Sequence, residues 1–151
     1  MSPIEIANAL KVARPSLGDE AGITLYRLLR LVALEDIMGP GASAISYYAG
    51  KKLGHSLNMR NVDEFLGLCT QLKIGIVEIP EMTEEHVHVD VYECITCSGL
   101  EPVGRPLCHF EGGMITGVVE SLTGKTAETN EVYCIGGLGH DRCGFSIKLR
   151  P

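Results

Sequence analysis

The sequence predicts an α+β domain: N-terminal helices followed by a β-β-α-β-β segment whose four strands form an antiparallel sheet covered by helices. Apolar residues recur at helical spacing as far as Leu72, and from Lys73 the pattern alternates at the period of a strand. A glycine-rich connection at 136–139 then joins two final strands, which is typical of a hairpin. At 151 residues, 45% of them apolar, the chain is long enough to bury a core.

The overall composition excludes some classes of function. A formal net charge of −6 argues against non-specific nucleic-acid binding, which needs clustered Lys and Arg. The N-terminus lacks the apolar core of a signal peptide, and no apolar run is long enough to span a bilayer. We therefore expect a soluble, cytoplasmic protein whose six cysteines are free thiols or bind metal.

The first part of the chain is predicted to be an extension. Residues 3–13 carry a partial apolar stripe at helical spacing and precede Pro15, which indicates a short helix. We therefore expect residues 1–17 to form an N-terminal helix or extension and residues 18–151 to form the main domain.

Three further helices are predicted, at 18–38, 42–57 and 61–72. The first has the broad apolar surface of a core-facing helix and is ended by a Gly-Pro-Gly turn. In the second, Gly50 and Gly54 lie four positions apart, so they either let another element approach closely or line a cavity.

Two strands follow. The first runs from Lys73 and is predicted to end near Pro80, and the second alternates from Glu85 with one apolar and one polar face. His86 and His88 share the polar face and could bind a metal, although histidines in such positions are usually solvated.

A helix is then predicted over residues 106–123. Pro106 suits the first helical position and Gly124 suits a left-handed C-terminal cap. Cys108 would lie in the first turn, where the helix dipole lowers the pKa of a thiol. Three glycines inside this helix must meet a closely packed sheet or a ligand: Gly112, Gly113 and Gly117.

The last forty residues contain a candidate metal site. Zinc prefers thiolate, imidazole and carboxylate ligands in a tetrahedron, and a set of these is supplied by Cys108, Glu131, Cys134 and Cys143. Because Glu131 and Cys134 are three positions apart, a strand that presents both to one ion must bulge or turn between them. The alternative is that these are buried free cysteines, as we expect for Cys69.

Other cysteines offer a rival set. Cys94 and Cys97 are spaced as half of a zinc knuckle and could combine with Cys134 and Cys143. Their Cys-x-x-Cys spacing also suits redox chemistry, although the expected strand-to-helix context is missing. His140, near the final turn, is a further candidate ligand.

The order of these motifs resembles the vinyl-4-reductase domain family. The resemblance covers about residues 20–149 and rests on Cys108, the following Gly-Gly pair, Glu131-x2-Cys134 and a glycine-rich turn closed by Cys143-x-Phe145. This domain occurs in archaeal hydrocarbon-binding proteins, in a bacteriochlorophyll-synthesis protein and in the sensor half of aromatic-responsive transcription activators. The free-standing form is most similar to the archaeal proteins.

The resemblance implies a zinc ion held by three Cys and one Glu, which correspond here to Cys108, Glu131, Cys134 and Cys143. Accessory ligands could come from Cys97, Cys94 and His140. It also implies a fold similar to the ligand-binding domain of nitric-oxide signalling and Golgi transport proteins. In these relatives, helices and sheet enclose an apolar pocket, and the domain commonly forms a homodimer.

The leading functional hypothesis is a zinc-containing domain, a sensor or carrier, that binds a hydrophobic small molecule such as a hydrocarbon or a tetrapyrrole. Burial of apolar surface would supply the affinity. The pocket is predicted to be lined by Ile45, Tyr48, Phe65, Leu68, Met114 and Val118.

Two alternatives belong to other classes. The family name suggests an enzyme that reduces a tetrapyrrole vinyl group, but the sequence shows no G-x-G-x-x-G turn, so an external electron donor would be needed. The third hypothesis is a dimeric interaction or scaffold protein, in which the helix faces make the contacts.

Overall fold

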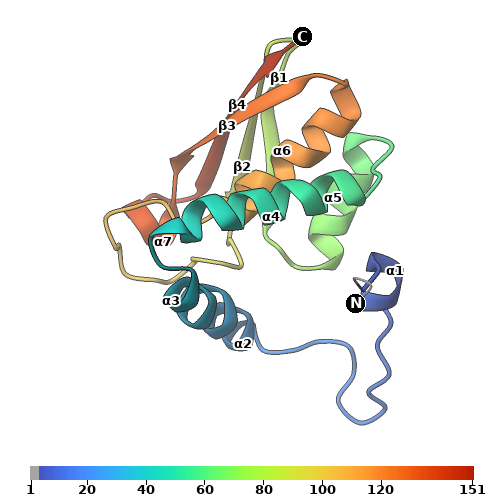
Figure 1. The fold of residues 1–151 in the computed structure, drawn as a ribbon, viewed down its shortest axis with the longest axis vertical. Helices are drawn as coiled ribbons and strands as arrows, with labels where there is room; N and C mark the ends of the chain where they lie inside the picture. The colour runs from blue at the N-terminus through green and yellow to red at the C-terminus, as the bar shows by residue number, and fades with distance from the viewer. Residues whose placement is uncertain (1–3) are drawn as a thin grey trace. The chain divides into compact units, whose positions relative to one another are not determined.

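The computed structural model describes residues 4–151, so Pro3, the first residue of the predicted N-terminal helix, lies outside the described residues (Figure 1). The chain divides into two compact units, Met1–Ile37 and Met38–Pro151. The predicted domain boundary after residue 17 falls inside the first unit and stays a prediction.

The first unit is helical. Its elements are α1 (Ile6–Ala9), α2 (Ile23–Arg27), a π-helical segment (Leu28–Leu34) and most of α3 (Glu35–Met38). The predicted helix at 18–38 is therefore present from residue 23 onward. Its predicted core-facing role is wrong, because the side chains of Leu25, Leu28, Leu29 and Val32 are all more than half exposed.

The second unit contains the sheet and the remaining helices. After a 3-10 turn, Gly39–Gly41, its elements are α4 (Ala42–Ser56), α5 (Val62–Gln71), β1 (Ile76–Met82), β2 (His86–Tyr92), α6 (His109–Thr123), β3 (Thr126–Tyr133), α7 (Ile135–Leu138) and β4 (Cys143–Arg150). The strands form one antiparallel sheet in the order β1-β2-β4-β3. The predicted α+β fold, with β-β-α-β-β after the helices, is confirmed.

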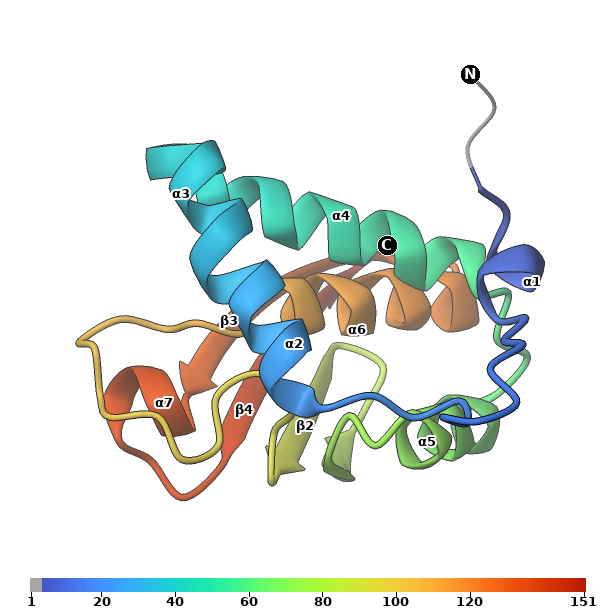
Figure 2. The ribbon, with the colours of Figure 1, turned by 90° about the horizontal axis from the view of Figure 1, so that it is seen from below.

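Helix α6 is the centre of this unit. Every residue from Glu111 to Val119 is buried, and the core continues onto the sheet through the β2 valines and through Phe145 and Ile147 of β4. On its other side, α6 packs along α4 (Figure 2). The layers are therefore sheet, α6 and α4.

Glycines allow α4 and α6 to approach this closely. A Cβ atom on Gly50 or Gly54 would lie 2.0 or 2.2 Å from the carbonyl oxygen of Phe110 or Met114. The close-packing interpretation of these two glycines is therefore correct. Gly113 and Gly117 face α4 in the same way, so the neighbour that needs them is a helix, and the expectation of a sheet or a ligand there was wrong.

Several predicted ends are confirmed and others move. Asn61 caps α5 by accepting a hydrogen bond from the Glu64 N–H at 2.9 Å, and Gly124 ends α6 with φ 68°. Strand β1 continues past Pro80, which is tolerated because β1 is an edge strand whose register shifts between Glu78 and Glu81. Helix α6 begins at His109, so the prediction that it starts at Pro106 was wrong.

Candidate metal centre

Five cysteines gather at one end of the sheet, where β2 ends and β4 begins. Cys143 is the first residue of β4 and pairs with Val91 of β2. The other four lie just outside regular elements: Cys94 and Cys97 follow β2, Cys108 is the N-cap of α6, and Cys134 is the N-cap of α7. All five are at most 1% exposed.

The sulfur atoms are spaced as ligands of one ion would be. The Sγ of Cys143 lies 3.3 Å from that of Cys97 and 3.7 Å from that of Cys108. The Cys108 Sγ is also 3.5 Å from Cys97 Sγ and 3.6 Å from Cys94 Sγ. A tetrahedral zinc ion with Zn–S bonds of about 2.3 Å holds its sulfurs about 3.8 Å apart. The thiols therefore need little movement to bind a metal.

These residues form two overlapping groups of four. One is Cys108, Glu131, Cys134 and Cys143, and the other is Cys94, Cys97, Cys108 and Cys143; within each, the ligand atoms lie within 4.8 Å of one another. The first group is the predicted ligand set, which the structure brings together. The rival set predicted Cys94 and Cys97 beside Cys134, whereas the structure groups them with Cys108.

Glu131 enters the cluster through an irregular strand. Its partner across the sheet is Phe145, so it shares the face that α6 covers, and the register then shifts between Glu131 and Tyr133. The bulge that the spacing of Glu131 and Cys134 requires is thus present. Glu131 Oε2 accepts a hydrogen bond from the Cys108 N–H at 3.0 Å, while its buried Oε1 has no hydrogen-bond partner among the described residues.

Burial and the neighbouring Cys134 raise the pKa of Glu131 to about 10. Hydrogen bonds from neighbouring thiols act in the opposite direction on two cysteines. The Cys108 and Cys134 thiols lower the pKa of Cys97 to about 4, and the Cys108 and Cys143 thiols lower the pKa of Cys134 to about 6. Protons are therefore shared unevenly within the cluster. A bound cation would let several ligands ionise together, because metal binding displaces protons from thiols and carboxylic acids.

Two glycines of α7 let the neighbouring loop close over the sulfurs. A Cβ on Gly136 would lie 2.5 Å from the Cys97 carbonyl oxygen, and one on Gly137 would lie 2.8 Å from Cys134 Sγ. The Gly137 carbonyl accepts a hydrogen bond from the Gly104 N–H at 2.9 Å. The glycine-rich connection, predicted only as a turn, therefore also determines how closely the cysteines meet.

The histidines have other partners. His140 Nδ1 accepts a hydrogen bond from the Cys134 N–H at 3.1 Å, and neither four-residue group of described residues includes His140. On the sheet, His86 Nε2 lies 2.8 Å from Ser146 Oγ and His88 Nε2 lies 2.9 Å from Asp90 Oδ1. His140 therefore positions the backbone of a cysteine in this structure, and its accessory-ligand role stays a prediction.

Sequence reasoning missed a buried carboxyl beside the cysteine loop. Glu111 of α6 is 3% exposed and accepts a hydrogen bond from the hydroxyl of Thr96, which lies between Cys94 and Cys97. The signal was a single acidic residue on a helix that is otherwise apolar or small. The pair ties this loop to α6.

The six predicted pocket residues lie in different environments. Phe65, Met114 and Val118 belong to one buried cluster, and Leu68 is half-buried on the same helix as Phe65. Ile45 and Tyr48 lie on α4 and are 51% and 70% exposed. The structure thus brings three of the six together in the core, and the role of all six as ligand contacts stays a prediction.

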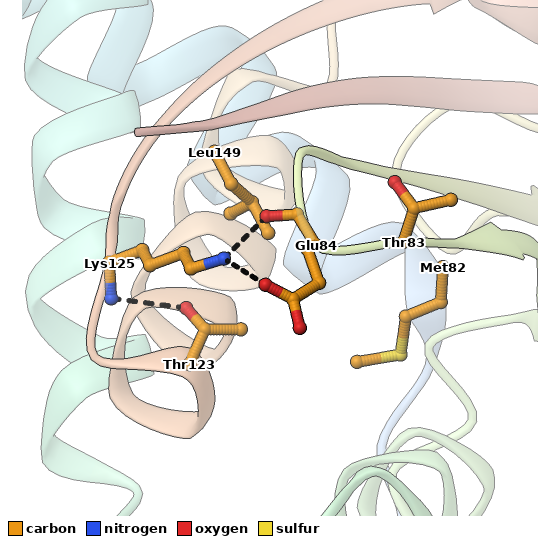
Figure 3. A pocket seen from close by; sticks show the side chains of 6 residues that line it. All are labelled: Met82, Thr83, Glu84, Thr123, Lys125 and Leu149. Carbon is orange, nitrogen blue, oxygen red and sulfur yellow. Dashed lines mark hydrogen bonds and ion pairs between the residues drawn. The ribbon is translucent and has the colours of Figure 1, made fainter. Parts of the chain in front are cut away.

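A surface pocket of about 470 Å³ lies at the other end of the sheet (Figure 3). Lys125 spans it, because its Nζ donates to the Glu84 carbonyl at 2.6 Å. Leu149 in its wall is six residues along β4 from Cys143, or about 20 Å at the rise of a strand. The lining residues are Met82, Thr83, Glu84, Thr123, Lys125 and Leu149, and none is a predicted ligand contact.

The fold and the site define an α+β domain with a buried thiol cluster at one end of its sheet. The family model of the vinyl-4-reductase domain matches residues 87–149. The chain is 35% identical over 133 residues to the protein MJ1642 of Methanocaldococcus jannaschii, which covers 88% of this chain and 81% of that protein. The chain belongs to the vinyl-4-reductase domain family, as its residue order predicts.

Two solved structures support the fold at low sequence identity. A vinyl-4-reductase family protein of Methanocaldococcus jannaschii superposes with a TM-score of 0.69 at 20% identity, covering 89% of this chain and 85% of its own. The phenol-responsive sensory domain of the transcription activator PoxR, solved with phenol, gives a TM-score of 0.68 at 21% identity, covering 85% and 75%. Both share the architecture of this chain.

The predicted likeness to nitric-oxide signalling and Golgi transport proteins is confirmed for the fold. A trafficking protein particle complex subunit 3 of Naegleria fowleri, covalently bound to palmitic acid, gives a TM-score of 0.61 at 12% identity, covering 85% of this chain and 95% of that one. An H-NOX protein of S. oneidensis gives 0.55 at 12%, covering 88% and 78%. Within residues 4–151, no helix has the length and apolar character to cross a membrane.

Proposed function

We propose that this chain is a small-molecule-binding domain whose folding depends on a zinc ion held by Cys108, Glu131, Cys134 and Cys143. One observation carries the metal assignment most directly. The buried Glu131 Oε1 has no hydrogen-bond partner among the described residues, and it belongs to a set of ligand atoms within 4.8 Å of one another. A buried carboxyl oxygen without a partner costs free energy, and a metal ion in the cluster would remove that cost.

The donor set favours zinc. Thiolates select soft or borderline ions, and four buried ligands make a closed tetrahedral site of the structural kind. Zinc bound there would supply folding energy by holding together four segments: the loop before α6, β3, the start of α7 and the start of β4. In this role the chain's own residues exclude water and fix the end of the sheet.

The ligand is proposed to be apolar. The sensory domain of PoxR was solved with phenol and the trafficking subunit with palmitic acid, so this fold accommodates apolar molecules in two neighbours. In this chain the proposed contacts are the core residues Phe65, Met114 and Val118, with Leu68 beside them. Phe65 and Leu68 lie on α5, which packs mainly against β1, so a shift of α5 would open the core to a ligand.

Ile45 and Tyr48 are proposed to meet the same ligand from α4 once it is bound. Their exposure leaves apolar surface that bound ligand would cover.

We also expect a homodimer. The helical run from Ile23 to Met38 leaves Leu25, Leu28, Leu29 and Val32 more than half exposed. Contiguous apolar surface of this kind marks an interaction site. A second copy of the same helix is the proposed partner.

A native mass spectrum of the protein as purified, compared with its denatured mass, tests the proposal. An excess mass of zinc supports the metal site, and an organic adduct supports the binding role and identifies the ligand class. A tetrapyrrole adduct would favour the reductase alternative for the same site. Absence of both metal and adduct would overturn the proposal and favour the scaffold hypothesis.

A further inference from the structure

The two ligand groups in the cluster share two members. Cys108 and Cys143 belong to both, while Glu131 and Cys134 belong only to one and Cys94 and Cys97 only to the other. We infer that the cluster binds two metal ions, bridged by the thiolates of Cys108 and Cys143. This inference rests on the metal site proposed above and adds a second ion to it.

The number of donor atoms fits two tetrahedral ions. Each ion needs four bonds, and a thiolate that bridges two ions serves both. Glu131 and Cys134 complete the first ion, and Cys94 and Cys97 complete the second. The two bridging sulfurs lie 3.7 Å apart, close to the edge of about 3.8 Å that two zinc–thiolate tetrahedra would share.

A single ion leaves two buried thiols unexplained. If only the first ion bound, Cys94 and Cys97 would stay protonated beside metal-bound thiolates, although they are 1% and 0% exposed. Their sulfurs lie 3.6 and 3.5 Å from Cys108 Sγ, and Cys97 Sγ lies 3.3 Å from Cys143 Sγ. These are separations between ligands of one ion, so a second ion uses both thiols without rearranging the loop.

The charge of the cluster also permits the second ion. A divalent ion brings two positive charges, and its binding ionises two further thiols, those of Cys94 and Cys97. The net charge of the buried cluster therefore stays the same as with one ion. One adjustment is required: the sulfurs of Cys97 and Cys134, which bind different ions, must move apart from their present 4.0 Å.

The spacing disfavours an iron–sulfur cluster. Such clusters place inorganic sulfide between the iron atoms and hold the cysteine sulfurs around the outside. In this chain the ligand atoms of each group lie within 4.8 Å of one another, which leaves room for an ion among them. The structure therefore favours thiolate-bridged ions of the zinc type.

Titration of the metal-free full chain with Co(II), followed by desalting and metal analysis, tests this inference. We expect two cobalt ions per chain, with an EPR signal per cobalt that weakens as the second ion binds, since bridging thiolates couple the two spins. One ion per chain at saturation would overturn the inference and leave the proposed zinc site standing. No bound ion would overturn both.

Two variants locate the second ion. A chain with both Cys94→Ala and Cys97→Ala should bind one cobalt with an undiminished EPR signal. The matched control is Cys69→Ala, because Cys69 is also 1% exposed but lies outside both groups, and it should still bind two. Two uncoupled ions in the wild-type chain, or two ions retained by the double variant, would contradict bridging by Cys108 and Cys143.

Discussion

The Cys108 N–H donates a hydrogen bond to Glu131 Oε2 at 3.0 Å, across 23 positions of sequence. This contact joins the start of α6 to the bulge at the end of β3. It places a thiol and a carboxyl of the candidate metal site against each other before any metal binds. The same contact explains why Cys108 takes a non-helical backbone conformation, with φ −93° and ψ 43°.

Replacement of a shared ligand should remove the metal and much of the stability. In Cys143→Ser the hydroxyl is a poor zinc ligand, so we expect loss of bound zinc and a decrease of several kcal/mol in the free energy of unfolding. Thermal unfolding with and without a chelator measures this. The chelator should lower the Tm of the wild type and of the Cys69→Ala control, and leave the variant unchanged. A Cys143→Ser chain as stable as the parent would refute a structural role for the metal.

Glu131→Gln should have opposite effects with and without metal. In the metal-free fold the pKa of Glu131 is raised from 4.5 to about 10, so the folded state holds a proton that the unfolded state loses above about pH 4.5. The stability contributed by this group is therefore full below about pH 4.5 and is lost as pH rises towards 10. The variant should be more stable than the metal-free wild type at neutral pH, by roughly 1–3 kcal/mol, and should bind zinc less tightly.

Denaturant unfolding of the metal-free proteins near pH 5 and near pH 8 checks this sign. Glu128→Gln is the control, because Glu128 lies on the same strand, is exposed and pairs with Arg150 at 2.7 Å. Its stability should follow the wild type at both values. A metal-free Glu131→Gln chain that is less stable than the wild type near pH 8 would show that the carboxyl is not a burden in the empty cluster.

Gly117→Ala should destabilise the contact between α4 and α6. The new Cβ would lie 2.2 Å from the Lys51 carbonyl oxygen, a backbone atom that cannot move without displacing the helix. We expect a loss of about 1–3 kcal/mol. Gly67→Ala is the matched control, since Gly67 also lies inside a helix but has nothing within 4 Å of its added Cβ. That change should stabilise the chain by about 0.5–1 kcal/mol. Equal effects in the two variants would contradict the close packing.

Polar residues on the exposed helix should prevent dimer formation. Leu28 and Val32 lie four positions apart and are 54% and 60% exposed, and their joint replacement by Ser removes apolar surface without filling a core. Light scattering should change from a dimeric to a monomeric mass. Val103→Ser, at a loop position that is 57% exposed, should leave the dimer intact. A monomeric wild-type chain would refute this interface.

Local signals predicted most of the second unit. Asn61 and Gly124 cap their helices as expected, because capping depends on one residue and its immediate neighbours. The start of α6 was missed, since the Cys108 N–H is used by Glu131 from a distant strand. Likewise, Gly113 and Gly117 were expected to face sheet or ligand, because a sequence does not show which helix will pack against them.

The candidate site was predicted in part. Residue types and order indicated Cys108, Glu131, Cys134 and Cys143, and the required bulge after Glu131 is present. The arrival of Cys94 and Cys97 beside Cys108 could not be foreseen. It depends on the loop that follows β2 folding back against Gly136 and Gly137, a contact between segments about 40 positions apart.

X-ray absorption at the zinc edge of the purified protein tests the central claim most directly. We predict a zinc edge whose first coordination shell is dominated by sulfur at about 2.3 Å, with a minor oxygen contribution at about 2.0–2.2 Å from Glu131. A first shell of nitrogen and oxygen alone, or a protein without a zinc edge, would contradict the assignment of the cysteine cluster as a zinc site.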